Sequence, residues 1–396
     1  MLRDRFTKIT PNGADSVSGG CRIRPAWLIL VGAFSVLMVF LYGKIDYLSP
    51  ALSGLDLTIY RQMAHAAPHL APVDAPFAQR LLGPYLVGVL PFPDPAGFYV
   101  LSCTAAVVLA CLSYLFLLRC GIEAHIAALT IFLFTCNRYL WGFPVWDFFQ
   151  LNDLLAILAV VAALWSLFER RWMSFSLALL VGVLARETPL LVVLASIGRL
   201  WSRNRYKWLL AIAPSLVVFT TLKLTIPSAI FSGAPVVFYL DAFLENIRKA
   251  GSVEVWTRLL VWSFVPVSFL PVIFPHRTKA FVAQHKVLTA YFFLAVLSCF
   301  FGGDNERLMF AAFLPYYILI AEIIQKDLRH KATLALLAIS AFVSSFHHLY
   351  GRYPLPGKVY TLVFSLIALA VVTATASATR MSTRGSTELA STAGHA

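Results

Sequence analysis

The sequence predicts an all-α polytopic membrane protein, and three properties of the chain lead to this fold class. Of its 396 residues, 59% are hydrophobic and only 13% are charged, which lies well outside the composition of soluble domains. The apolar residues form long runs, and the basic residues gather in the short segments between these runs. This composition excludes a disordered chain, a collagen-like repeat and a disulfide-stapled small protein.

The net charge indicates which kind of partner to expect, and the cysteines indicate whether a metal site or disulfides are present. A formal charge of +13, from 32 basic and 19 acidic residues, would suggest nucleic-acid binding in a soluble protein. Here the basic residues lie between apolar runs and determine topology, so we expect membrane lipid and no nucleic acid as a partner. The sequence indicates no particular protein partner. The six cysteines form no CxxC pair, which favours buried side chains over a metal site or disulfides.

The elements follow in order from a basic tail, residues 1–25, which we expect in the cytoplasm. Residues 26–378 then form one membrane domain with about ten transmembrane helices, of which the first is a signal anchor. Residues 379–396 are a second cytoplasmic tail. The predicted spans are 26–43, 97–118, 124–140, 148–168, 207–226, 256–274, 287–301, 308–325, 332–349 and 359–378.

The segment 173–198 is apolar, but Arg186, Glu187 and Pro189 interrupt it near its middle. Basic residues flank both of its ends, and a single crossing would place one of these basic groups outside. We therefore predict a re-entrant pair of half-helices with Arg186 and Glu187 at the tip. Broken backbone at membrane depth is tolerated only inside protein or along a wet cavity, so this tip is expected to line a cavity.

Two long loops, residues 44–96 and 227–255, are predicted on the outer face. In the first loop Leu55, Ile59 and Met63 recur every fourth residue, which is typical of an amphipathic helix on the membrane surface. This topology brings seven polar residues to one face, and carboxylates with arginines at membrane depth indicate a functional site. The candidate site residues are Asp56, Arg80, Asp147, Arg186, Glu187, Asp304 and Arg307.

These residues also have structural interpretations, which stay open at the level of sequence. Asp56 and Asp304 are suited to cap helices, because both directly precede predicted helical segments. Arg80 is suited to anchor a helix to lipid phosphate. Arg186 and Glu187 are adjacent, and such a pair can be a simple ion pair at a helix break.

Three segments resemble the GT-C class of integral-membrane glycosyltransferases. The first is Asp56 ahead of an amphipathic helix in the first outer loop, and the second is Leu-Ala-Arg-Glu-Thr-Pro at 184–189. The third is Asp-Asn-Glu-Arg-Leu at 304–308, followed by Pro315. The resemblance covers roughly residues 26–325 and lies in pattern and topology. That class often carries paired acids in the first loop, whereas here Asp56 stands alone, ten residues after Asp46.

The resemblance implies transfer of a sugar from a polyprenyl-phosphate carrier to an acceptor, on the outer face of a bacterial cytoplasmic membrane. The lipid-linked sugar is the donor substrate, and neither a cofactor nor a metal is specifically implied. Asp56 would be the catalytic base, with Asp147 or Asp153 as alternatives. The arginine fork binds two phosphate oxygens at once, so arginines would hold the carrier phosphate. The implied substrate-binding residues are Arg80, Asp147, Arg186, Glu187, Asp304 and Arg307.

Other classes of membrane protein also fit parts of this pattern. A lipid-linked glycan polymerase or ligase shares the substrates and the large outer loops. A transporter or flippase of lipid-linked substrates would place charges along both halves of its pathway, which the short basic cytoplasmic loops disfavour. A purely structural subunit is the third alternative.

Overall fold

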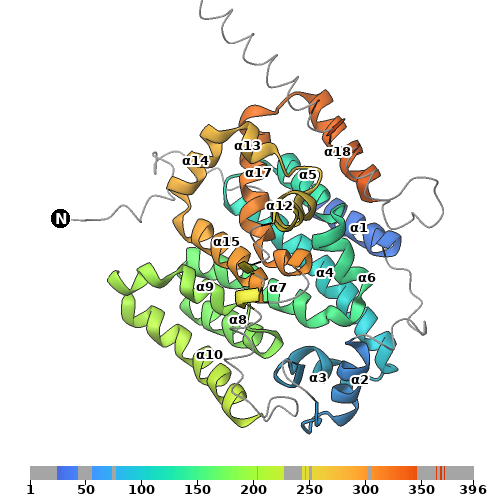
Figure 1. Cartoon of the computed structure of the whole chain (residues 1–396), viewed down its shortest axis with the longest axis vertical. Helices are drawn as coiled ribbons and strands as arrows, with labels where there is room; N and C mark the ends of the chain where they lie inside the picture. The colour runs from blue at the N-terminus through green and yellow to red at the C-terminus, as the bar shows by residue number, and fades with distance from the viewer. Residues whose placement is uncertain are drawn as a thin grey trace, which may run out of the picture.

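The computed structural model of the chain describes residues 25–42, 56–73, 77–202, 204–226, 252–301 and 305–345, with short pieces at 243–245, 247–248, 363, 366–367 and 370. Within these residues all regular elements are helices, and Figure 1 shows them packed into one bundle. The predicted span 359–378, both tails and most of the outer loop 227–255 lie outside the described residues.

Among the described residues, four helical stretches are long and apolar enough to cross a membrane. They are α4 (Asp94–Arg119), α7 (Leu151–Phe168), α10 (Arg205–Thr225) and Met309–Asp327, which joins η9 (Met309–Ala312) to α17 (Phe313–Asp327). Two bent helix pairs raise the count to 6 if each pair is one span. The all-helical prediction is confirmed and a multi-pass membrane protein is supported, but the predicted count of about ten spans is not confirmed.

The predicted span 124–140 is bent, and a side chain explains the bend. Helix α5 (Ala124–Thr135) stops before Asn137, and the following helices, from η3 (Arg138–Gly142) onward, turn by 69°. The Asn137 side-chain oxygen accepts two backbone N–H groups of η3, at 2.9 and 2.8 Å. Its amide donates to the carbonyls of Ser263 and Val265, at 2.9 and 3.1 Å. Asn137 therefore caps the new helix and ties it to a distant segment.

The predicted span 256–274 is a series of short helices rather than one long helix. It runs from α12 (Val253–Trp256) through η6 (Thr257–Val261) and η7 (Trp262–Phe264) to α13 (Leu270–Ile273). Pro266 and Pro271 fall in this stretch, and a proline removes a backbone donor and clashes with the preceding turn. The apolar composition is that of a span, but the two prolines break the helix.

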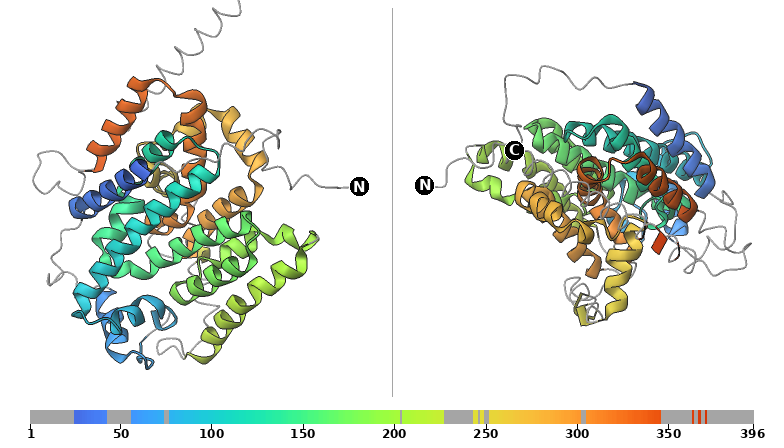
Figure 2. Two further views of the ribbon diagram at one scale, coloured as in Figure 1. Left: turned by 180° about the vertical axis from the view of Figure 1, so that it is seen from behind. Right: turned by 90° about the horizontal axis from the view of Figure 1, so that it is seen from above.

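The remaining helices complete the bundle around α7. They are α1 (Pro25–Tyr42), α2 (Leu57–Ala66), η2 (Phe77–Gln79), α3 (Leu82–Gly88), α6 (Phe143–Trp146), η4 (Phe148–Gln150), α8 (Trp172–Ala185), α9 (Leu190–Ala195), η5 (Ile197–Trp201), α14 (Pro275–Gln284), α15 (Lys286–Ser298), η8 (Cys299–Phe301), α16 (Asn305–Leu308) and α18 (Lys331–Ser345). Figure 2 shows the same bundle from behind and from above.

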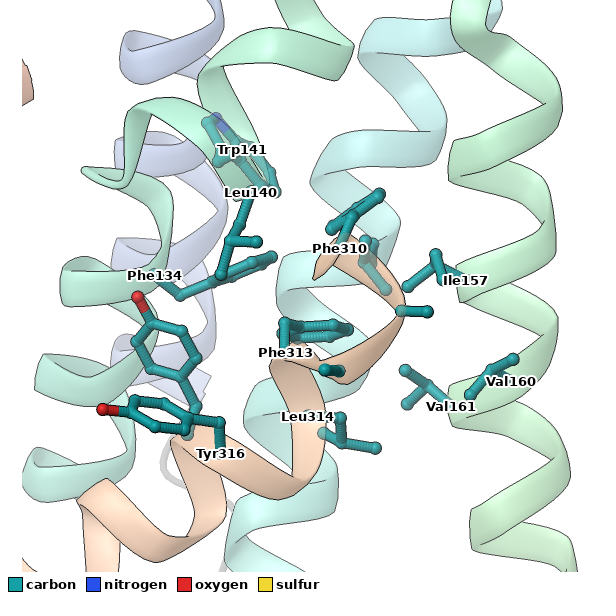
Figure 3. Close-up of a cluster of buried hydrophobic side chains, with 14 of the residues drawn as sticks. Phe134, Leu140, Trp141, Ile157, Val160, Val161, Phe310, Phe313, Leu314 and Tyr316 are labelled. Atoms are coloured by element: carbon teal, nitrogen blue, oxygen red, sulfur yellow. The ribbon is translucent and has the colours of Figure 1, made fainter. Parts of the chain in front are cut away.

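An aromatic core holds α5, α7 and α17 together (Figure 3). The ring of Phe134 stacks on Phe313 with centroids 4.4 Å apart, and it meets Trp141 edge-on at 5.4 Å. Ile157 and Val161 of α7 face this group. Such ring pairs add about 1 kcal/mol beyond the area that they bury. The core therefore packs α5, α7 and α17 against one another.

The directions of the helices define two ends of the bundle. At one end, called the basic end here, Arg119 after α4 pairs with Glu169 after α7, and Arg329 after α17 pairs with Glu123 before α5. The chain therefore leaves α4, α7 and α17 at the basic end and begins α7 and α17 at the other. Figure 1 shows α2 and α3 together at one extremity and α13, α14 and α18 at the opposite one.

The predicted re-entrant segment follows a hairpin path. Helix α8 starts at the basic end and stops at Arg186, and α10 packs along α8. Lys223, near the end of α10, donates to Gln79 at the far end of the bundle. The first turn of α10 is held by Trp208, whose ring N–H donates to Ser196 Oγ at 3.0 Å. Helices α8 and α10 thus run in the same direction, and the segment with α9 and η5 leads the chain back to the basic end between them. The depth of this segment in a membrane stays a prediction.

Candidate functional site

The centre of the candidate site is Asp153, in the first turn of α7. Asp153 is only 4% exposed. The carboxylate accepts a hydrogen bond from Nη1 of Arg186 and lies 3.5 Å from Nε of Arg307. Arg186 directly follows α8 and Arg307 lies in α16, so segments far apart in sequence meet at one carboxylate. Buried charges of this kind depend strongly on one another, because each is costly without its partner.

A second carboxylate extends the cluster toward the surface. Oε1 of Glu187 lies 3.8 Å from Nε of Arg186 and 3.9 Å from Nη2 of Arg80. The side chain of Glu187 is 48% exposed, so the cluster opens to its surroundings at this residue. Burial would lower the pKa of Arg80, but Tyr60, Glu187 and Asp153 raise it above its ordinary value. Arg80 is therefore a buried, permanently charged group.

The fold holds Arg80 in place through Asn152, the neighbour of Asp153. The Asn152 amide donates to the carbonyl of Arg80 at 3.2 Å, and its oxygen accepts the N–H of Gly83 at 2.9 Å. A Cβ at Gly83 would lie 2.7 Å from that oxygen, so only glycine allows this approach. The guanidinium also lies over the ring of Phe77, and Nη1 donates to the Tyr60 hydroxyl at 3.4 Å.

The position of Arg186 depends on the close packing of α8 against α7. A Cβ at Gly182 would lie 2.8 Å from Cβ of Ala159 in α7 and 2.6 Å from Cγ of Pro189. Gly182 therefore lets both the neighbouring helix and the chain break approach the last turn of α8. Pro189 has no N–H for the carbonyl of Ala185 and its ring clashes with that carbonyl, so α8 ends at Ala185 and the chain is extended at Arg186. The break directs Arg186 toward Asp153.

Asp56 lies at the edge of this cluster, just before α2. Its carboxylate is half-buried and accepts a hydrogen bond from Nε2 of Gln150 at 3.2 Å. Gln150 is buried and precedes Asp153 by three residues, and one turn after Asp56 the buried Tyr60 contacts Arg80. Asp56 is thus linked to the cluster in two ways, through Gln150 toward Asp153 and through Tyr60 of α2 toward Arg80. Asp147 is also buried, three residues before Gln150.

An apolar groove of about 380 Å³ lies between α1 and α4. Tyr99 in its wall meets the ring of Phe148 edge-on at 6.1 Å, and Ser102 of the same helix donates to the Phe148 carbonyl at 2.5 Å. Phe148 lies between Asp147 and Gln150, so Tyr99 contacts the segment whose Gln150 donates to Asp56. The groove is lined by Val36, Val39, Phe40, Tyr99, Val100, Cys103, Thr104, Val107 and Val108.

Comparisons of the chain with protein-family models, with curated proteins and with solved structures find no match. The site must be interpreted from its own chemistry. Within the described residues, no group of three His, Cys, Asp or Glu side chains is arranged to hold a metal ion. In the same part of the chain, cations outnumber carboxylates in the cluster, since three arginines contact Asp153 and Glu187. Lys223 adds a fourth cation within electrostatic reach of Glu187.

The structure brings together four of the residues singled out in the sequence, namely Arg80, Arg186, Glu187 and Arg307. Asp56 joins them through Gln150 and Tyr60, Asp147 lies nearby, and Asp304 is outside the described residues. Sequence reasoning gave Asp153 only a reserve role, although a carboxylate at the start of a span was a usable signal. The contact of Gln150 with Asp56 had no sequence signal at all.

Proposed function

We propose that the chain is an integral-membrane glycosyltransferase that moves a sugar from a polyprenyl-phosphate carrier to an acceptor hydroxyl. The observation that carries the proposal is the convergence of Arg80, Arg186 and Arg307 around Asp153 and Glu187. A lipid phosphate that leaves during transfer develops negative charge, and fixed guanidinium groups are suited to stabilise it. A phosphate group carries up to about two negative charges, which the surplus of cations would balance.

Two buried donors support binding of an anion at this cluster. Nε of Arg80 and Nε of Arg186 are buried and have no hydrogen-bond partner within the described residues. Buried donors without a partner are rare in proteins because they lose their contact with water. A phosphate that enters beside the half-exposed Glu187 would supply acceptor oxygens to both. Arginine can present two parallel N–H groups to such oxygens, so the carrier phosphate would be held in a defined orientation.

In the proposed reaction, the acceptor hydroxyl oxygen attacks the anomeric carbon of the carrier-linked sugar. A new carbon–oxygen bond forms, and the bond from that carbon to the phosphate oxygen breaks with its electron pair moving to the phosphate. Asp56 takes the hydroxyl proton as general base, and polyprenyl phosphate leaves. The hydrogen bond from Gln150 would orient the Asp56 carboxylate. The apolar groove between α1 and α4 would receive the isoprenoid chain beside it.

In this proposal the cluster faces the outside of a bacterial cytoplasmic membrane, and the basic end faces the cytoplasm together with both tails. The excess of basic residues at one end agrees with the charge bias of membrane proteins. The proposal requires no metal, and a divalent ion would be an additional component. A lipid-linked glycan polymerase or ligase, or a flippase, would share the phosphate site, so the experiments must separate binding from transfer.

The first experiment tests the phosphate site through binding of undecaprenyl phosphate, with undecaprenol as the uncharged probe. The purified protein should bind the phosphate form more tightly. Arg307→Lys keeps the charge but loses the fork, and we expect roughly tenfold weaker binding, the loss of one charge-assisted hydrogen bond. Lys279→Gln, at the basic end, is the control and should bind normally. Equal binding of undecaprenol and undecaprenyl phosphate would refute the phosphate site.

The second experiment tests the base. Asp56→Asn keeps the size of the side chain and removes its basicity, so sugar transfer should fall by roughly 10²-fold or more while undecaprenyl phosphate still binds. Glu254→Gln, which removes an exposed carboxylate of α12, serves as the control. Transfer at the parental rate by Asp56→Asn would place the base elsewhere. A flippase would show carrier binding and lipid translocation with no sugar transfer in any variant.

A further inference from the structure

Five basic side chains gather at one corner of the basic end, far from the candidate site. They come from three consecutive segments. Arg170 and Arg171 form the turn between α7 and α8, Arg199 lies in η5, and Arg205 and Lys207 begin α10. The hairpin path of this region brings the segments together, because α8 packs against both α7 and α10. These five side chains are called the basic corner below.

The described part of the chain supplies no carboxylate partner to the basic corner. Within the described residues none of its side chains forms an ion pair, and the neighbouring Glu169 is paired with Arg119. Arg199 is partly buried, and its pKa is lowered by burial and by the charge of Arg170. Elsewhere at this end Arg277 makes two hydrogen bonds to Asp327, at 2.7 and 3.1 Å. Within the described residues, other cations of this end are therefore paired, whereas this group is in surplus.

Arg170 has a backbone conformation that glycine would adopt with less strain. Arg170 has a φ of 58°, which is the left-handed region that favours glycine. The turn between α4 and α5 also has a residue with positive φ, and there it is Gly121, at a φ of 83°. An arginine in this conformation costs about 1 kcal/mol or more relative to relaxed backbone. The fold keeps a charged side chain where glycine would fit without strain.

Exposed apolar side chains flank the basic corner. Met173 in the first turn of α8 is 86% exposed, and Leu210 in α10 is 74% exposed. Tyr206 and Ile197 are also exposed beside the cations. Cations next to exposed apolar and aromatic side chains are typical of a surface that lies at the head-group level of a bilayer. A soluble anion would match the charges but would leave the apolar groups in water.

We propose that the basic corner binds the head group of an anionic phospholipid. The phosphate of the lipid would lie between Arg170 and Arg199 and relieve the repulsion between these two cations. Arg171, Arg205 and Lys207 would add long-range attraction, while Met173 and Leu210 contact the acyl chains. The site stands independently of the sugar-transfer proposal, since its residues share no contact with Asp153 or its partners within the described part of the chain.

The test compares phosphatidylglycerol with phosphatidylcholine, added to the purified full chain in detergent, with Tm and native mass spectrometry as readouts. We expect phosphatidylglycerol to bind selectively and to raise Tm by roughly 3 °C or more. Arg199→Gln should weaken phosphatidylglycerol binding by roughly fivefold. Arg170→Gly should weaken it similarly, yet leave the lipid-free Tm unchanged or higher, because glycine removes the strained φ. Lys279→Gln, an exposed cation at the same end, is the control and should bind like the parent.

Three results would overturn the proposal. The first is equal binding of the two phospholipids. The second is an undiminished response to phosphatidylglycerol in Arg170→Gly and Arg199→Gln. The third is a Tm shift by glycerol phosphate at matched concentration as large as that by phosphatidylglycerol, which would identify a site for a soluble anion instead. None of these variants touches the candidate site, so carrier binding should be unchanged in all of them.

Discussion

Replacement of Asp153 is the most direct perturbation of the charge cluster. Asp153→Asn preserves the shape of the side chain, but it removes the charge that faces Arg186 and Arg307. Loss of one partner in a buried pair costs about 3–5 kcal/mol, because an uncompensated charge is left in the interior. Arg186→Gln is expected to cost less, about 2 kcal/mol, since Asp153 keeps Arg307 at 3.5 Å.

The double variant reveals whether Asp153 and Arg186 act as a pair. If they do, Asp153→Asn with Arg186→Gln should cost about 3–5 kcal/mol instead of the additive value of about 5–7, a coupling of about 2 kcal/mol. The free energy of unfolding would be measured by SDS titration of the detergent-solubilised protein, followed by tryptophan fluorescence. Asp327→Asn with Arg277→Gln is a matched cycle at the basic end, where the pair is more exposed and a coupling of about 1 kcal/mol or less is expected. Additivity within about 0.5 kcal/mol at Asp153 and Arg186 would refute the central role of that carboxylate.

The same set of proteins separates Asp153 from Glu187 as partners of Arg186. Glu187 is adjacent in sequence, but its carboxylate lies 3.8 Å from Arg186 Nε and is about half exposed. Glu187→Gln should therefore cost less than about 1 kcal/mol. The ion pair between neighbours at a helix break, which the structural interpretation of the sequence expects, is present at 3.8 Å, and Arg186 also contacts Asp153 more closely. The chain break directs Arg186 across to α7.

Two further predictions address the scaffold and the topology. Gly182→Ala should lower the free energy of unfolding by about 1–3 kcal/mol, because the new methyl meets Ala159 and Pro189. Gly198→Ala, where nothing lies within 4 Å, is its control, and equal stability of the two variants would contradict the packing argument. Thr58→Cys and Asn204→Cys should be labelled by impermeant maleimide from opposite sides of the membrane, and labelling from one side would contradict the assignment of the two ends.

The general class of the fold could be predicted from composition, but the shape of individual spans could not. Hydropathy places an apolar run at 256–274 without regard to Pro266 and Pro271, whose missing donors and ring clashes break it. Those prolines were a readable local signal. The bend after α5 was not readable, because it depends on the bonds from Asn137 to the carbonyls of Ser263 and Val265, more than a hundred residues away.

The candidate site shows the same division between local and long-range signals. Arg186 and Arg307 are conspicuous in sequence, since each is a charge beside apolar residues with a helix break or start. Asp153 is equally visible, but its importance comes from two arginines that reach it from α8 and α16. Gly83 and Asn152 had no pattern to reveal them, because their role is a close approach between segments that meet only in the folded chain.

The way in which charges are paired differs between the basic end and the cluster around Asp153, and this difference distinguishes structural ion pairs from a binding site. At the basic end, pairs such as Arg277 with Asp327 join helix ends, and a pair that is complete within the protein has little left to offer a ligand. Around Asp153 the cations share carboxylates, and the Nε donors of Arg80 and Arg186 have no hydrogen-bond partner within the described residues. Such an arrangement costs stability unless an anion completes it, which is why function is sought there. The basic corner around Arg170 follows the same logic at the surface, with a lipid head group as the completing anion.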